Sequence, residues 1–299
     1  MYKDCSLCPR QCHVNREVQV GACHEGAQIV LARAALHMWE EPCISGENGS
    51  GAVFFSGCSL GCVFCQNLQI SKGQIGKTVS TERLSEIFFE LKEQGANNIN
   101  LVTPDHYIPS ICKAIKGAKE RGMDLPFVYN CSGYETVESL RALEGLVDVY
   151  LPDFKYWEKE TSARYSKATD YPDVAKKAIE EMVRQVGGCR FDENDMIQKG
   201  VIVRHLVLPG KVREAKEIVT YLYETYGDEI YLSLMNQYTP GENAAEKFSA
   251  VPELVRKVTR REYDRLIDHV LALGVTNAFV QEGETALESF IPAFDLEGV

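Results

Sequence analysis

Apolar segments with the character of β-strands alternate with helical patterns over most of the chain. The strand-like runs span residues 52–55, 98–102, 127–130, 147–151, 201–206 and 230–234. Capping residues and the spacing of apolar residues predict helices over 80–94, 108–122, 137–143, 173–186, 212–226 and 259–274. Strands that alternate with helices form a parallel sheet that is covered on both faces. The sequence therefore predicts an α/β protein.

The length of the alternating region limits the kind of barrel. About six β/α units follow a glycine-rich loop at 46–51, and the alternation ends near residue 274. An eight-unit barrel needs about 250 residues, which is more than this span provides. We therefore expect residues 49–299 to form a partial (β/α)6 barrel of the TIM type with a C-terminal tail. Residues 1–48 are expected to form a small cysteine-rich, metal-binding extension.

Three cysteines lie on one short loop directly after the first strand-like run. Cys58, Cys62 and Cys65 form a C-x3-C-x2-C pattern. A 4Fe-4S cluster normally takes four cysteines, so a loop with three leaves one iron open for a substrate or cofactor. The alternative is a structural zinc site with a fourth ligand elsewhere, but zinc sites favour paired C-x2-C knuckles that lie well apart. The spacing therefore favours an iron–sulfur cluster with an open iron.

The same loop carries the aromatic Phe64 before its last cysteine. With a strand before its first cysteine, it resembles the loop of the radical S-adenosylmethionine (SAM) enzymes. The resemblance implies a partial barrel of the radical SAM type, and a cluster on Cys58, Cys62 and Cys65 whose open iron chelates SAM. In that family an electron from the cluster cleaves SAM to methionine and a 5′-deoxyadenosyl radical, which abstracts hydrogen from a substrate.

Polar residues follow the strand-like runs, at the strand ends where active sites of such barrels lie. Asp153-Phe154-Lys155 comes after the fourth run, and Arg204 lies within the fifth. These residues resemble the D-x-K motif and the strand arginine of the activases of glycyl-radical enzymes, the pyruvate formate-lyase activating enzyme type. The resemblance implies that Lys155 and Arg204 hold the SAM carboxylate and that Asp153 orders this region.

The chain also departs from the activase pattern. The activases carry a G-G-E-type motif after the second strand, where this chain has Thr103-Pro104-Asp105. Either Thr103 and Asp105 replace those contacts with the SAM amine, or the pocket receives another substrate. Gln237 stands where the activases have a histidine near SAM, and Asn130 at the end of the third run is a further polar candidate.

A second group of cysteines lies near the N-terminus. Its members, with C-x2-C-x3-C-x10-C spacing, are Cys5, Cys8, Cys12 and Cys23. Four such cysteines suit a tetrahedral zinc site or a second 4Fe-4S cluster, and reduced free thiols are the third interpretation. The presence of one cluster in the chain favours iron–sulfur slightly. The CxxCPRxC motif resembles that of a poorly characterised branch of the activase family.

Composition argues against several other classes of protein. No apolar run approaches the roughly 18 residues that span a bilayer, and the N-terminus lacks the apolar region of a signal peptide, so we expect a cytoplasmic protein without a membrane partner. A net charge of −11 argues against nucleic-acid binding, which needs clustered Lys and Arg. In a reducing compartment the 11 cysteines suggest metal ligation more than disulfides. The remaining cysteines, expected to be buried thiols by default, are Cys43, Cys112, Cys131 and Cys189.

The predicted function is activation of a glycyl-radical enzyme by removal of a glycine α-hydrogen. Radical modification of a small molecule or of another protein is the alternative within the class. A non-catalytic iron–sulfur carrier or redox sensor, or a zinc-stabilised binding protein, would explain the cysteines but not the polar strand ends. Cluster reduction would need a low-potential donor such as flavodoxin or ferredoxin, and an exposed cluster implies anaerobic function.

Overall fold

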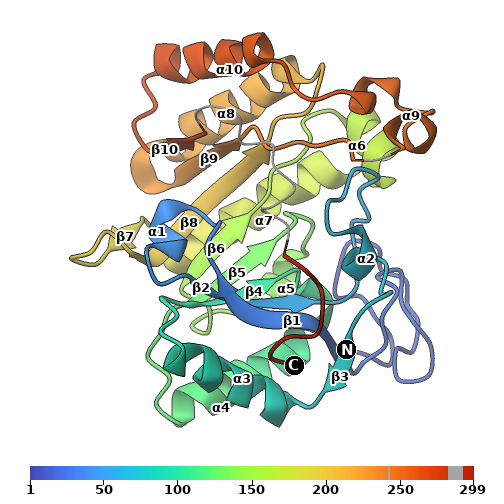
Figure 1. The fold of residues 1–299 in the computed structure, drawn as a ribbon, viewed down its shortest axis with the longest axis vertical. Helices are drawn as coiled ribbons and strands as arrows, with labels where there is room; N and C mark the ends of the chain where they lie inside the picture. The colour runs from blue at the N-terminus through green and yellow to red at the C-terminus, as the bar shows by residue number, and fades with distance from the viewer. Residues whose placement is uncertain (242, 282–291) are drawn as a thin grey trace.

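The structure is a computed structural model that describes residues 1–241, 243–281 and 292–299 (Figure 1). Its strands are β1 Ile29–His37, β2 Ser50–Phe55, β3 Lys77–Val79, β4 Ile99–Val102, β5 Phe127–Cys131, β6 Val149–Pro152, β7 Arg190–Phe191, β8 Ile197–Leu206, β9 Tyr231–Met235 and β10 Ala278–Val280. Its α-helices are α1 Pro42–Ser45, α2 Leu68–Ser71, α3 Thr81–Glu93, α4 Ile108–Glu120, α5 Val137–Arg141, α6 Lys159–Ser166, α7 Tyr171–Val186, α8 Val212–Tyr226, α9 Ala244–Lys247 and α10 Arg260–Leu273. Short 3-10 helices are η1 Asp105–Tyr107, η2 Gly227–Glu229 and η3 Pro252–Val255.

One sheet runs through the molecule in the order β10-β9-β8-β6-β5-β4-β2-β1-β3. All neighbours from β2 to β10 in this order pair in parallel. At one edge of the sheet β1 pairs antiparallel with β2 and β3. Elsewhere, off the main order of strands, β7 pairs antiparallel with β8. The curved, mainly parallel sheet confirms the predicted α/β class and partial barrel (Figure 1).

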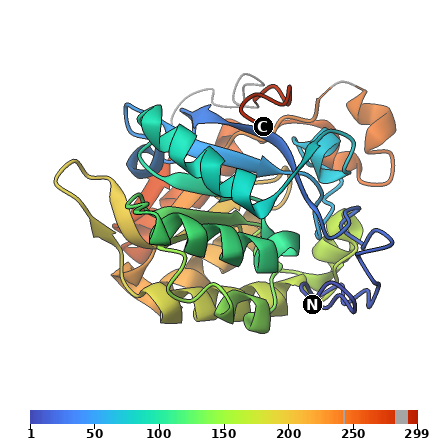
Figure 2. The same ribbon diagram turned by 90° about the horizontal axis from the view of Figure 1, so that it is seen from below.

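The long helices lie along the outer side of the curved sheet, as Figures 1 and 2 show for α3, α4, α7, α8 and α10. Every residue of β2, β4, β5 and β6 is buried. Such strands read as continuous apolar runs because both faces of the sheet are covered. No helix in the three described ranges is long and apolar enough to cross a membrane.

The structure contains several elements that the sequence does not predict. Residues 29–37, which form β1, show no regular alternation of apolar and polar residues. Strand β10 adds a further parallel member beyond the expected six, and it is only 3 residues long, too short for a periodic signal. Helix α6 is not among the predicted helices, because it is rich in polar residues and has only a weak apolar stripe. The division at residue 48 stays a prediction, and residues 242 and 282–291 of the second predicted domain lie outside the described ranges.

Both ends of the described chain return to the start of the sheet. Residues 1–28 contain no helix or strand and pack beside the loop that follows β2. Near the C-terminus the Ala34 N–H donates to the carbonyl of Glu297 at 2.8 Å, and the Leu296 N–H donates to that of Ala32 at 3.2 Å. Figure 1 shows this last segment beside β1. The first strands of the barrel are therefore covered by two segments far apart in sequence.

Candidate functional site

The loop with three cysteines leaves the carboxyl end of β2 through Ser56 and Gly57. Gly57 has a φ of +86°, and a Cβ at this position would lie 2.7 Å from the carbonyl oxygen of Cys23. Glycine is required here because no side chain fits and the backbone is left-handed. The close approach lets the Cys58 N–H donate to the Cys23 carbonyl at 3.2 Å. The two cysteine groups of the chain are thus in direct backbone contact.

The sulfur of Cys62 is buried beneath this loop and is met by two hydroxyl groups. The Tyr156 hydroxyl lies 3.4 Å and the Ser166 hydroxyl 3.2 Å from Cys62 Sγ, and each is placed to donate to it. The Val63 N–H donates to the carbonyl of Tyr165 at 2.8 Å. Hydrogen bonds to a sulfur stabilise its anionic form and tune a bound metal. This donor set fits a metal-bound thiolate, because the sulfur brings the charge that the hydroxyl groups solvate.

A pocket of about 240 Å³ opens beside the three cysteines. Of the residues predicted from sequence for this site, those that line it are Cys58, Cys62, Phe64, Cys65, Thr103, Asn130, Asp153, Lys155, Arg204 and Gln237. They come from the carboxyl ends of β2, β4, β5, β6, β8 and β9 or the loops that follow, where a barrel places its active site. The structure therefore brings together nearly all of the predicted site residues.

Asp153 connects the two cations of the pocket. Its Oδ2 accepts from Lys155 Nζ at 2.5 Å, and its Oδ1 accepts from Arg204 Nε at 3.1 Å. Burial raises the pKa of Asp153, but the charges of Lys155 and Arg204 outweigh burial and leave it below its usual value. Burial lowers the pKa of Lys155, but the Asp153 charge outweighs it and raises the pKa to about 12. Both ions of this pair are therefore charged near neutral pH.

Glu40 is a pocket residue that sequence reasoning missed. It follows β1, and its Oε2 accepts from Arg204 Nη1 at 3.2 Å. Its Oε1 accepts from the side-chain amides of Asn100 at 3.0 Å and Asn130 at 3.3 Å. Asn130 in turn accepts from Arg204 Nη2 at 2.5 Å. Nothing in the local sequence around Glu40 marks this contact, because its partners lie on β4, β5 and β8.

The pocket consequently presents both signs of charge to a ligand. The carboxyl groups of Asp153 and of Glu40, whose pKa burial raises against the opposing charge of Arg204, face two cations, Lys155 and Arg204. SAM carries a sulfonium, an ammonium and a carboxylate, so it needs partners of both signs. The arrangement fits such a ligand better than it would fit a simple anion or cation.

The residues after β4 lie partly in the pocket and partly in the protein interior. Thr103 lines the pocket and has a φ of +58°, a rare conformation for a β-branched residue. Asp105, in η1, is buried beneath the cysteine loop, where it accepts from the Ser59 hydroxyl at 2.6 Å. Asp105 does not line the pocket, so its predicted contact with SAM gains no support from its position.

Asp105 lies near a second buried carboxyl group, Glu135. Burial, then the charge of Asp105, raises the pKa of Glu135. The pKa of Asp105 is lowered, because the neighbouring His106 and the hydrogen bond from Ser59 outweigh burial. Two close buried carboxyl groups do not both ionise readily. This pair therefore holds one charge and one proton near neutral pH.

The N-terminal cysteines gather around Gly21 and Arg16. A Cβ on Gly21 would lie 3.4 Å from Cys23 Sγ and 3.5 Å from Cys12 Sγ. The guanidinium of Arg16 is 2% exposed and approaches Cys5 Sγ at 4.0 Å. Arg16 forms no ion pair with a carboxylate in the described ranges. The guanidinium donates to the backbone carbonyls of Glu25, Gly26 and His106, and thiolates beside it would balance its charge.

All 11 cysteines are free thiols in the structure. No group of three or more His, Cys, Asp or Glu side chains within the described ranges is arranged to hold a metal ion. A single zinc ion would draw thiolates to about 2.3 Å from one point, whereas in an iron–sulfur cluster each thiolate binds a different iron. The metal assignments therefore rest on the cysteine spacing and on the groups around the sulfurs.

Among the other cysteines, Cys131 ends β5 and also lines the pocket. Gln237 reaches the pocket from the segment after β9, and its Oε1 accepts from Gln281 Nε2 at 3.2 Å. Its backbone carbonyl accepts from Gln66 at 3.1 Å. Gln237 thereby ties the wall after β9 to the cysteine loop.

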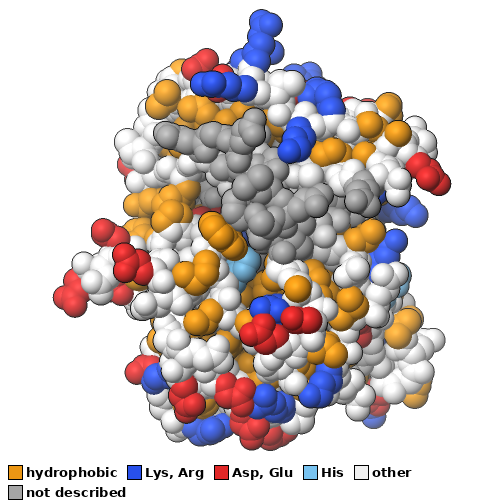
Figure 3. Space-filling model, in the orientation of Figure 1, with side chains coloured by type: hydrophobic (Ala, Val, Ile, Leu, Met, Phe, Trp, Pro, Cys, Tyr) orange, Lys and Arg blue, Asp and Glu red, His pale blue; other side chains and the backbone are white. Residues whose placement is uncertain are grey.

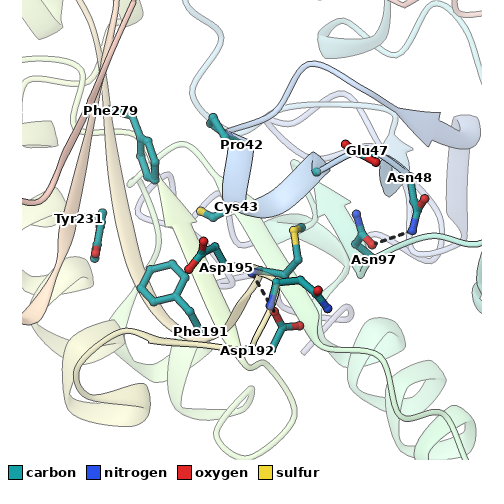
Figure 4. Close-up of a pocket in the computed structure, with 13 residues that line it drawn as sticks. Pro42, Cys43, Glu47, Asn48, Asn97, Phe191, Asp192, Asp195, Tyr231 and Phe279 are labelled. Carbon is teal, nitrogen blue, oxygen red and sulfur yellow. Dashed lines mark hydrogen bonds between the residues drawn. The ribbon is translucent and has the colours of Figure 1, made fainter.

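A larger pocket of about 870 Å³ lies at the opposite, amino end of the strands. Figure 4 shows Tyr231 and Phe279 on one side, Cys43 of α1 between, and the hydrogen-bonded pair Asn48 and Asn97 on the other. Acidic side chains gather beside it where the hairpin of β7 and β8 projects (Figure 3). No residue predicted for the site lines this pocket, and barrels place their chemistry at the other end of the strands.

Comparison with known proteins gives matches over most of the chain. Residues 52–222, more than half of the 299 residues, match the profile of the Radical SAM superfamily. An uncharacterized protein of Methanocaldococcus jannaschii is 30% identical over 277 residues, which cover 90% of this chain and 74% of the relative.

Comparison with solved structures gives matches at low sequence identity, among them one with a TM-score above 0.5. The crystal structure of Streptococcus suis SuiB bound to S-adenosylmethionine has a TM-score of 0.52 at 13% identity, over 76% of this chain and 48% of that chain. SuiB bound to precursor peptide SuiA has a TM-score of 0.49 at 12% identity, over 74% and 46%. The FeFe-hydrogenase maturase HydG from Carboxydothermus hydrogenoformans has a TM-score of 0.45 at 16% identity, over 74% and 55%. The chain spans about half the length of these structures.

Proposed function

Because the chain belongs to the radical SAM superfamily of enzymes, we propose that Cys58, Cys62 and Cys65 bind a 4Fe-4S cluster and that the adjoining pocket binds SAM. The observation that carries this proposal is the single pocket that joins these cysteines to Lys155 and Arg204. With SAM bound, such a cluster supplies the electron that cleaves SAM to methionine and a 5′-deoxyadenosyl radical.

The residues of this chain would bind and orient SAM. Lys155 and Arg204 are suited to the SAM carboxylate, and Asp153 keeps both cations in place through its two oxygens. The Glu40 carboxyl group and the side-chain oxygen of Asn130 face the same space and are acceptors that suit the ammonium group. Arg204 is held by Glu40, Asp153 and Asn130, so binding of a carboxylate requires it to exchange at least one of these partners.

Aromatic residues would shield the reacting groups from water. Phe64 is 6% exposed and packs edge-on against Tyr156, Tyr165 and Tyr238 at centroid distances of 6.2, 6.1 and 6.2 Å. Rigid packing of this kind fixes the loop between Cys62 and Cys65. A dry, fixed pocket protects a radical from side reactions.

Activation of a glycyl-radical enzyme is the function that the site supports best. The support is the placement of Asp153, Lys155 and Arg204, which carry the activase resemblance, around one pocket. Reduction would come from a low-potential flavodoxin or ferredoxin, under anaerobic conditions. The N-terminal cysteines would hold a second metal centre, either zinc or 4Fe-4S, and the second set is Cys5, Cys8, Cys12 and Cys23.

The test is 5′-deoxyadenosine formation by the anaerobically reconstituted, reduced protein. We expect product from the unaltered chain and none above background from Cys58→Ala, whose unfolding midpoint should be unchanged. Cys112→Ala, at a cysteine on α4 outside the pocket, is the matched control and should keep full product formation. Equal product from Cys58→Ala would contradict the proposal.

The substrate class is read in the same assay. Pyruvate formate-lyase labelled with α-deuterated glycine serves as the probe. Activase function predicts transfer of deuterium into 5′-deoxyadenosine. Product without deuterium would retain the radical SAM assignment and reject the activase assignment for this probe.

A further inference from the structure

Arg10 makes an unusual set of contacts for a residue of an irregular segment. Its guanidinium donates to the carbonyls of Ser59 at 3.0 Å and Leu60 at 3.0 Å, both on the cysteine loop. It also donates to the carbonyls of Ser166 at 2.7 Å and Lys167 at 2.5 Å, at the end of α6. One cation therefore joins two segments that are about 100 residues apart in the sequence.

The second of these segments touches the buried cysteine directly. The Ser166 hydroxyl lies 3.2 Å from Cys62 Sγ and 2.6 Å from the Tyr156 hydroxyl, so one of the two hydroxyl groups donates to the sulfur and the other to its hydroxyl neighbour. The last carbonyls of a helix lack partners within it, and an Arg side chain stabilises them. By holding the end of α6 against the loop, Arg10 holds the hydroxyl donors against Cys62.

The position of Arg10 is set by the N-terminal cysteine segment, residues 5–23. Arg10 lies between Cys8 and Cys12 in sequence, and its guanidinium lies over the ring of Tyr134 at 5.3 Å. At the far end of the segment the Cys23 carbonyl accepts from the Cys58 N–H. The segment therefore contacts the cysteine loop at two points. The Cys23 carbonyl contacts the start of the loop, and the Arg10 guanidinium contacts it further along.

A metal bound by the segment would keep both of these contacts in place. Residues 5–23 form no helix or strand, and only turn-type backbone hydrogen bonds, such as those from the Cys5 N–H to the Val14 carbonyl and from the His13 N–H to the Cys5 carbonyl, order their backbone. Metal ligation by cysteines supplies folding free energy to small segments of this kind. Arg16, buried beside the sulfurs without a carboxylate ion pair in the described ranges, is the charge that thiolates of a filled site would balance.

We infer that Arg10 is a positioning residue for the loop that carries Cys58, Cys62 and Cys65, and that the metal-bound N-terminal segment is the platform that holds Arg10 in place. The inference rests on the proposed function, because it concerns retention of the cluster on that loop. Its consequence is that the two cysteine sites are coupled: emptying the N-terminal site weakens the cluster at the other site. Such coupling is reciprocal.

Arginine is required in this role because it donates in two directions from one plane. A lysine ammonium could meet one pair of carbonyls but could not bridge both segments. Hydrogen bonds from a charged group are among the stronger ones in proteins. Loss of Arg10 should therefore release the cluster about 10-fold faster, which is a modest estimate for the loss of one such bond.

The experiment measures cluster retention rather than turnover. The anaerobically reconstituted protein is challenged with an iron chelator. The part of the electron paramagnetic resonance signal that changes on SAM addition is followed in time, because only the cluster beside the pocket contacts SAM. Arg10→Ala should lose this signal about 10-fold faster than the unaltered chain, and Arg10→Lys should resemble Arg10→Ala. Arg260→Ala, whose side chain is 94% exposed, is the control and should behave as the unaltered chain.

The platform is tested by Cys12→Ala, alone and combined with Arg10→Ala. Both single variants should accelerate cluster loss. The double variant should lose the cluster little faster than either single variant, because both changes disrupt the same set of contacts. Iron, zinc and sulfide contents of Cys12→Ala show that the N-terminal site is empty, and the unfolding midpoint monitors general destabilisation. The inferred role of the N-terminal segment would be contradicted by additive effects of the two changes. It would also be contradicted by a Cys12→Ala variant that keeps the SAM-responsive cluster.

Failure of this inference can be told from failure of the proposed function. A reconstituted, unaltered chain that binds no SAM-responsive cluster would reject the proposed function. A SAM-responsive cluster that Arg10→Ala and Arg10→Lys release at the normal rate would reject the positioning role and leave the proposed function in place. If Arg10→Ala does not fold, Arg10→Lys carries the test by itself.

Discussion

Lys155 shows how the pocket solves the problem of burying charge. Its ammonium is held by the Asp153 carboxylate at 2.5 Å, and the same carboxylate binds Arg204. A buried charge is tolerated when it is paired and hydrogen-bonded. Because Asp153 keeps Arg204 as a partner when Lys155 is removed, the network survives loss of the lysine.

Lys155→Ala should therefore weaken SAM binding more than it affects the cluster. We expect the Kd for SAM to rise about 10-fold, as for loss of one charge-assisted hydrogen bond, with iron content unchanged. Equilibrium binding of SAM to the anaerobic protein measures the first and iron analysis the second. Lys113→Ala, at a side chain 68% exposed on α4, is the control. An unchanged Kd would remove Lys155 from the binding site.

The buried carboxyl group of Glu135 predicts a pH dependence of stability. Its Oε2 has no hydrogen-bond partner among the described residues, as suits a protonated acid, and its pKa is raised from 4.5 to about 8 by burial and by the charge of Asp105. The contribution of Glu135 to the free energy of unfolding is fully present below the pKa that this group has in the unfolded chain. This contribution is lost as the pH rises to about 8.

Glu135→Gln keeps a neutral group at every pH. Relative to the unaltered chain, the variant should gain about 1.4 kcal/mol of unfolding free energy per pH unit across this window. Above it the difference should level off. Denaturant unfolding from about pH 5 to about pH 9 measures it. A difference that does not change with pH would show that Glu135 is charged throughout.

At the scale of elements, helix α10 shows how a distant cap supports the pocket. The Thr259 side chain accepts from the Glu262 N–H at 3.2 Å, and the Glu262 carboxylate accepts from the Thr259 N–H at 2.9 Å, which together form a capping box. Glu262 also accepts from the Gly210 N–H at 2.8 Å. Tyr263 of the same helix donates to the Leu234 carbonyl at 2.7 Å, beside the pocket end of β9.

Thr259→Ala removes one half of this box. We expect a loss of about 1 kcal/mol of unfolding free energy, measured by denaturant unfolding. Thr259→Ser keeps the hydroxyl acceptor and should retain most of the stability. If serine and alanine prove equally destabilising, the methyl group and not the cap would account for the effect.

At the scale of the whole molecule, the pocket takes its walls from nearly the full length of the chain. His37 and Trp39 follow from β1, the cysteine loop forms one side, and Pro292 belongs to the segment that returns to β1. Phe294 of that segment packs edge-on against Phe54 at 5.6 Å between centroids. The segment that returns to β1 thus completes a site whose floor is the parallel sheet.

The sequence by itself determined the class of fold and predicted the chemistry of the cysteine loop. Buried strands and amphipathic helices are visible as local periods, and a cysteine motif such as that of residues 58–65 is visible as a local spacing, because both depend on neighbours in the chain. Residues at strand ends, such as Asp153 and Gln237, could be placed in one site because all parallel strands finish at the same edge of a barrel.

Only the tertiary structure decided which side chains complete the site. Glu40 meets Arg204 from 164 residues away, and Arg10 reaches Ser166 from 156 residues away. Asp105, which the sequence placed with Thr103, turns into the interior within η1. These outcomes depend on how distant segments pack against one another, and no period or spacing within one segment encodes the identity of its distant partner.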